Sequence, residues 1–141
     1  MYKIDFLPYN GAGQIKLGSA REEARKTLGT FKEFTKTKSS KNTTDDFSFC
    51  HVFYNEQNKV EAVEFFDKTK SFDTTEFLFK GENLFLLSLT GLKSLLKSSS
   101  IDFQEQENGS VLRSDAIGLS VFSPDKEKIE TILIYKKGYY D

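Results

Sequence analysis

Two runs of alternating side chains, joined by a short polar turn, constrain the fold of this chain more than any other feature. In the first run every second residue carries an aromatic or imidazole ring: Phe47, Phe49, His51 and Phe53. The second run, residues 60–66, is rich in valine and phenylalanine, and Asn-Glu-Gln-Asn at 55–58 separates the two. Because alternate residues of a strand share one face, this pattern predicts an antiparallel hairpin.

A short helix is predicted over residues 20–28. Its apolar face consists of residues at helical spacing: Ala20, Ala24 and Leu28. The charged residues are expected to face water: Arg21, Glu22, Glu23, Arg25 and Lys26. Ser19 and Glu22 match a capping box, in which each side chain satisfies a free backbone N–H group at the start of the helix. Gly29 supplies the stop signal.

The rest of the chain predicts one more helix and several strands. Residues 89–98 carry a leucine stripe at helical spacing, so a second helix is expected there. The polar stretch 36–44 is expected to form a flexible hairpin loop. Alternation and turn residues predict strands at 2–7, 15–17, 101–104, 110–113, 116–122 and 129–135, and residues 77–79 and 84–89 are expected to be short strands or turns. The expected fold class is α+β, a mainly antiparallel sheet with two short helices.

The two halves of the chain follow one order of predicted elements. Four positions of the first half correspond to four of the second: Ile15, Leu17, Ser19 and Leu28 to Leu84, Leu86, Ser88 and Leu96. The hairpin at 47–66 corresponds to residues 116–135 in the same way. We therefore expect a single α+β domain of residues 1–141, built from two tandem helix-plus-sheet repeats at about 1–70 and 71–141.

Composition limits the compartment and the partners. The 20 Lys and Arg nearly balance the 21 Asp and Glu, so no overall field selects nucleic acid or an anionic membrane. One local basic cluster is explained as a solvated loop: Lys32, Lys36, Lys38 and Lys41. Cys50 is the only cysteine, which excludes an internal disulfide and suits a reducing compartment. Since neither a signal peptide nor a transmembrane segment is visible, a cytoplasmic protein is expected.

No group of residues predicts catalysis, a metal or a cofactor. Residues 13–19 have the glycine spacing of a phosphate-binding loop but lack its lysine. Cys50 and His51 are neighbours on a predicted strand, so they point to opposite faces and cannot share a hydrogen bond. With one Cys and one His, a metal site would need carboxylates as all its other ligands. The sequence favours a protein that binds over one that catalyses.

Several motifs resemble those of small bacterial β-rich proteins. The strand-turn-helix unit lies at 13–29, and a related unit follows at 79–88. Gly-Leu-Ser-Val-Phe and Lys-Gly-Tyr-Tyr-Asp occupy residues 118–122 and 137–141. The methionine that usually follows the first glycine is absent. Proteins of this kind are similar to immunity proteins of bacterial polymorphic-toxin systems, and the repeated layout is similar to that of β-lactamase-inhibitor protein and SmpA-like folds.

This resemblance implies a non-catalytic cytoplasmic protein that binds a cognate bacterial toxin and masks it. Acids and aromatic residues of the sheet would meet a cationic surface of the toxin. The expected contacts are Glu61, Glu64, Asp67, Asp73 and Glu76, with Tyr54 as an aromatic anchor. The alternative function is a small-ligand or lipid-binding module in which the aromatic-rich sheet lines a pocket.

Overall fold

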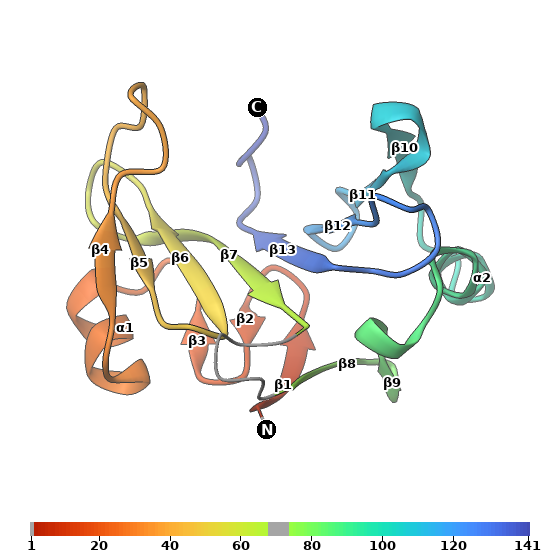
Figure 1. Cartoon of the computed structure of the whole chain (residues 1–141), viewed down its shortest axis with the longest axis horizontal. Coiled ribbons are helices and arrows are strands. Elements are labelled where there is room, and N and C mark those ends of the chain that lie inside the picture. Colours follow the sequence, from red (N-terminus) through yellow and green to blue (C-terminus); the bar gives the residue numbers. More distant parts are fainter. Residues whose placement is uncertain (1, 68–73) are drawn as a thin grey trace.

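An eight-stranded antiparallel sheet forms the larger layer of this α+β structure, a computed structural model that describes residues 2–67 and 74–141 (Figure 1). From one edge to the other its strands are β10 (Gln104–Gln106), β11 (Val111–Ser114), β12 (Leu119–Phe122), β13 (Thr131–Tyr135), β7 (Val60–Phe66), β6 (Cys50–Tyr54), β5 (Thr44–Asp46) and β4 (Lys32–Phe34). Residues 101–104 were predicted as a strand, whereas β10 begins only at Gln104.

A second sheet and the helices complete the fold. The strand order of the second sheet is β3 (Ile15–Lys16), β2 (Gly11–Ala12), β1 (Tyr2–Leu7), β8 (Thr75–Phe79) and β9 (Glu82–Asn83). Within it β1 and β8 run parallel, and the other pairs are antiparallel. The α-helices are α1 (Arg21–Leu28) and α2 (Leu89–Ser98), and the short 3₁₀ turns are η1 (Leu84–Leu86) and η2 (Glu107–Gly109).

One hydrophobic core joins the two sheets and both helices. The ring of Phe65 on β7 lies 5.3 Å from that of Phe77 on β8, measured between centroids. Burying one phenylalanine side chain contributes about 1.5–3 kcal/mol, so such contacts hold the layers together. Ala24 of α1 and Leu92 of α2 belong to the same core. The smaller sheet and the helices therefore cover one face of the eight-stranded sheet. In residues 2–67 and 74–141, no helix covers its other face, which we call the open face.

The eight-stranded sheet consists of two halves, β4 to β7 and β10 to β13. In each half the strands follow chain order from the edge of the sheet to its centre, where β7 pairs with β13. The registers repeat as well: Val52 with Val63 in one half, and Val121 with Ile132 in the other. In both halves a helix cation forms an ion pair with a glutamate of the edge strand: Arg25 with Glu33, and Lys93 with Glu105. Two tandem units would produce this arrangement, and their origin by duplication stays a prediction.

The predicted hairpin is confirmed, but its first strand is shorter than expected. β6 pairs with β7, and the register shifts between Phe53 and Tyr54, which leaves Glu61 as the extra residue of a β-bulge on β7. The alternating run breaks at Ser48, whose φ of 79° belongs to the left-handed region and is incompatible with a continuous strand. Phe47 and Phe49 are nevertheless buried in the core. The apolar pattern therefore predicted burial correctly but overestimated the length of the strand.

Both helices lie where predicted, but the cap predicted for the first helix does not form. In α1 the N-cap is Ala20, which offers no side-chain hydrogen bond, and the Ser19 hydroxyl instead donates to the carbonyl of Lys16. The capping-box prediction was wrong because Ser19 lies one residue too early. In α2 Ser88 is the N-cap, and its hydroxyl accepts from the Gly91 N–H at 3.0 Å.

Arg21 and Arg25 do not face water as predicted, because both bind Asp45 on β5. The Asp45 carboxylate has no exposed surface and lies 2.8 Å from Arg25 Nε, 3.4 Å from Arg21 Nη2 and 2.8 Å from the Tyr54 hydroxyl. Arg21 is only 7% exposed, and its guanidinium lies 4.2 Å from the centroid of the Tyr54 ring. A helical pattern gives no sign of a buried carboxylate on a distant strand.

The Asp45 network predicts a loss of stability in acid. Burial alone would raise the pKa of Asp45, but hydrogen bonds from Arg25, Tyr54 and Arg21 outweigh it and hold the pKa below its usual value. The unfolded chain, with an Asp pKa of about 3.9, therefore takes up the proton first. The stabilisation is complete above that pH and is lost as the pH falls through the lower folded-state value. Urea unfolding of the wild type and of Asp45→Asn, at steps from pH 7 to pH 2, should converge in acid. A difference that stays constant over this range would contradict the assignment.

Candidate functional site

The open face of the eight-stranded sheet is the candidate functional site. Strand register places one row of residues directly across its centre: Asp46, His51, Glu64, Leu133, Ser120 and Arg113. Their chain neighbours, such as Val63 and Ile134, point the other way into the core. Because the side chains of a strand alternate between faces, the whole row lies on the open face.

Aromatic rings flank this row on both sides. The His51 ring lies 5.1 Å from Phe34 and 4.7 Å from Phe66, edge to face, measured between centroids. On the other side Phe53, Ala62 and Tyr135 form a small apolar cluster, and Leu133 and Tyr139 pack against it. Phe122 is 40% exposed and Tyr140 is 44% exposed. The rings of Phe122 and Tyr140 are therefore accessible to a partner, whereas those of Phe53 and Tyr135 are buried.

Two carboxylates lie at the centre of this aromatic surface. Glu61 and Glu64 on β7 are half-buried, and within residues 2–67 and 74–141 neither forms an ion pair or a side-chain hydrogen bond. Burial, followed by the charges of Glu61, Tyr140 and Glu64, raises the pKa of Tyr139 to about 12. The Tyr139 hydroxyl is therefore protonated at neutral pH, and both carboxylates lie near it.

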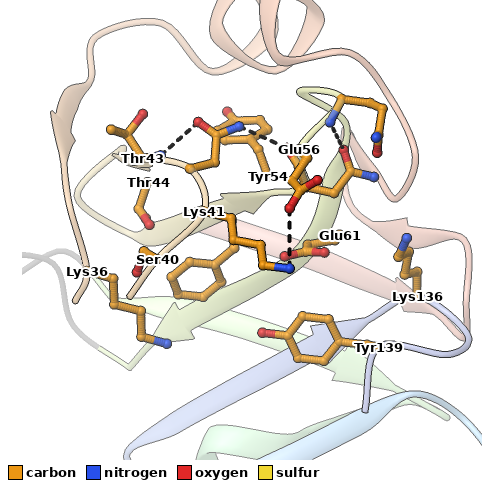
Figure 2. A pocket seen from close by; sticks show the side chains of 14 residues that line it. Lys36, Ser40, Lys41, Thr43, Thr44, Tyr54, Glu56, Glu61, Lys136 and Tyr139 are labelled. Atoms are coloured by element: carbon orange, nitrogen blue, oxygen red, sulfur yellow. Dashed lines mark hydrogen bonds and ion pairs between the residues drawn. The ribbon is translucent and has the colours of Figure 1, made fainter. Parts of the chain in front are cut away.

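A groove of about 460 Å³ lies at one end of the open face, between the β4–β5 loop and residues 136–139. Figure 2 shows Lys36 and Lys136 at opposite ends of the groove, with Glu61 and Tyr139 between them. The Lys36 ammonium lies 4.3 Å from the centroid of the Phe53 ring, and Lys41 is paired with Glu56 at 3.3 Å. The groove therefore carries charges of both signs around aromatic rings.

The structure brings together only part of the predicted contact set. Glu61 and Glu64 share the open face, whereas Asp67 lies just beyond β7 and forms an ion pair with Lys128 at 3.0 Å. Glu76 lies on β8 of the other sheet, next to the buried Phe77, so it points away from the core on the opposite side of the molecule. Asp73 lies outside the described residues.

Tyr54 is not the surface anchor that the sequence suggested. It is 4% exposed, and its hydroxyl donates to Asp45. Burial, followed by the hydrogen bond to Asp45, raises its pKa. Cys50, Val52 and Tyr54 lie on the side of β6 that faces the core. The ring therefore packs inside the fold and is not offered to a partner.

Sequence reasoning missed the contribution of residues 133–140 to the open face. Leu133, Tyr139 and Tyr140 are far from Glu64 in the chain and reach it only because β13 pairs with β7. The sequence signal for this surface is the tyrosine pair in Lys-Gly-Tyr-Tyr-Asp, at residues 137–141. Long-range strand pairing could not be assigned from local patterns.

The other sequence candidates have structural explanations. The Gly13 and Gly18 N–H groups donate to the carbonyls of Asp5 and Val60, so neither is free to bind phosphate. Cys50 is fully buried in the core while His51 lies on the open face, which confirms that they point apart. Burial raises the pKa of the Cys50 thiol. In the described residues, no group of three or more His, Cys, Asp or Glu is placed to hold a metal, and no helix could span a membrane.

Comparisons of the chain with protein-family models, with curated protein sequences and with solved structures find no match. The resemblance to immunity proteins therefore stays a prediction.

Proposed function

We propose that this chain is a non-catalytic, cytoplasmic immunity-type protein that binds a cognate bacterial toxin through its open face and masks it. The observation that supports this most directly is the uncovered face itself, with exposed and half-buried rings around two carboxylates that lack ion pairs in the described residues. Aromatic anchors surrounded by polar groups are typical of protein interfaces.

The charge distribution changes the kind of contact that we expect. The sequence suggested an acidic surface for a cationic toxin, but Lys36 and Lys136 lie in the same groove as Glu61. A face with both signs favours a partner of mixed charge that meets Glu64 and Glu61 with a basic side chain. Asp67 contributes less, because its charge is already paired with Lys128.

A small-ligand or lipid-binding module is the second candidate, and the groove is the observation in its favour. It combines the rings of Phe53 and Tyr139 with the ammonium groups of Lys36 and Lys136, which could hold an amphipathic anion. This function predicts that an amphipathic anion binds saturably and that Lys36→Ala weakens this binding. It also predicts that substitution of Glu64, outside the groove lining, has no effect on function.

The immunity function is tested by co-expression of this chain with the product of any adjacent candidate toxin gene. Cells that carry both genes are expected to grow, and the two proteins are expected to copurify. Glu64→Lys should weaken the complex about tenfold or more, because it places a cation where the partner's basic side chain docks.

Glu76→Lys is the matched control, because it makes the same charge change on the opposite side of the molecule. It should leave both growth and affinity unchanged. Death of the cells without a copurifying complex would reject the toxin as the partner. Equal effects of the two substitutions would show that overall charge, and not the open face, determines binding.

A further inference from the structure

A second pocket lies where three segments meet: the β1–β2 turn, the β11–β12 turn and the residues after β13. Its volume is about 470 Å³. We call it the tyrosine pocket and define it by the residues Tyr9, Tyr139, Tyr140, Asp115 and Asp141, which line it. No part of the sequence predicted this site, because its residues come from both ends of the chain.

The walls of the tyrosine pocket are held by a packed aromatic cluster. Tyr139 stacks on Tyr135 with the ring centroids 5.7 Å apart, and Tyr140 meets both rings edge-on at 4.9 and 5.0 Å. The Tyr135 hydroxyl donates to Asp115 Oδ1 at 2.7 Å. The rings and this carboxylate are therefore positioned by the fold before any ligand binds.

The pocket is electronegative. Hydrogen bonds from Arg113 and Tyr135 lower the pKa of Asp115, so this carboxylate is ionised at neutral pH. Burial, followed by the charges of Asp115 and Asp141, raises the pKa of Tyr9, which places both carboxylates near the Tyr9 hydroxyl. Aromatic faces add to this field, because the π-electrons of a ring attract cations.

Cationic side chains of the chain itself already lie over two of the rings, those of Tyr140 and Tyr9. The Arg113 guanidinium lies 4.0 Å from the centroid of the Tyr140 ring and is fixed by two hydrogen bonds to Asp115, at 2.8 and 2.7 Å. The Lys137 ammonium lies 5.2 Å from the centroid of the Tyr9 ring. Lys137 is exposed and forms no ion pair within the described residues, so a competing cation can displace it.

We propose that the tyrosine pocket binds an organic cation, a guanidinium or alkylammonium group that replaces the Lys137 ammonium over the Tyr9 ring and takes Asp141 as its counter-ion. The group can belong to a free small molecule or to a basic side chain on a protein surface, since the recognition chemistry is the same. This proposal does not rest on the immunity function, although the pocket shares Tyr139 and Tyr140 with the open face.

The test is a titration of the full chain followed by the NMR signals of its tyrosine rings. The probes are choline and the peptide acetyl-Gly-Arg-Gly-amide, and 3,3-dimethylbutan-1-ol serves as the uncharged analogue of choline. Both cations are expected to bind with a dissociation constant on the order of 1 mM, and the alcohol is not expected to saturate. Tighter binding of choline would indicate a small-molecule ligand, and tighter binding of the peptide a protein side chain.

Three variants test the mechanism. Tyr9→Leu should weaken binding of both cations about fivefold, the effect of losing one cation–π contact. Lys137→Ala should strengthen binding, because it removes the internal competitor, whereas Lys136→Ala is the matched control and should change nothing. Dispersed NMR spectra show that each variant is folded. Saturable binding of the alcohol, or equal affinities of the Lys137→Ala and Lys136→Ala variants, would overturn the proposal.

Discussion

Replacement of Asp45 with Asn is expected to lower the free energy of unfolding by about 3 kcal/mol, the effect of removing one partner from a buried charge network. The Asn side chain keeps the shape of Asp45 but not its charge, so Arg21, which is 7% exposed, would remain in the core without its counter-ion. The Tyr54 hydroxyl would also lose its ionised acceptor. The measurement is urea unfolding at pH 7, followed by circular dichroism.

Glu33→Gln is the matched control for this prediction. Glu33 binds the same Arg25 at 2.8 Å, but its side chain is 48% exposed, so water takes over the contact when the charge is removed. The urea midpoint of this variant should therefore stay close to that of the wild type. Comparable losses in the two variants would show that Asp45 stabilises the fold no more than a surface acid does.

The sequence predicted the parts of this fold that depend on local patterns. Residues 21–28 and 89–98 are helical, and the hairpin that ends at Phe66 is present, because apolar periodicity reports directly on which side of an element is buried. Arg21 was expected in water because no local pattern shows the Asp45 carboxylate that it meets.

The sequence predicted fewer of the residues of the candidate site than of the fold. Glu61 and Glu64 were identified because they are close together in the chain, and both lie on the open face. Glu76 was assigned to the same surface although it belongs to the other sheet. The rings of Tyr139 and Tyr140 join this surface only through the pairing of β13 with β7, which a single sequence does not reveal. Strand order across a sheet is a long-range property, and the candidate site depends on it.

Gly118→Ala is expected to be the second strongly destabilising substitution, with a loss of about 3 kcal/mol in the free energy of unfolding. Gly118 has φ +69°, and a Cβ atom there would lie 2.7 Å from the Tyr135 carbonyl oxygen and 2.8 Å from Tyr9 Cε1. The oxygen belongs to the backbone of β13, beside the point where the Tyr135 N–H donates to the Gly118 carbonyl. It therefore cannot move without disturbing the sheet.

Gly81→Ala separates the two causes of this effect. Gly81 has φ +80°, but no atom lies within 4 Å of a Cβ built there, so its substitution brings only backbone strain of about 1 kcal/mol. The excess loss in Gly118→Ala over Gly81→Ala, from urea unfolding, measures the clash. Since the clash also pushes Tyr9 outward, Gly118→Ala should weaken cation binding in the tyrosine pocket, whereas Gly81→Ala should not. Equal stabilities of the two variants would mean that β13 and Tyr9 can shift at little cost in free energy. The Tyr9 ring would then not be held in the fixed position that cation binding in the tyrosine pocket requires.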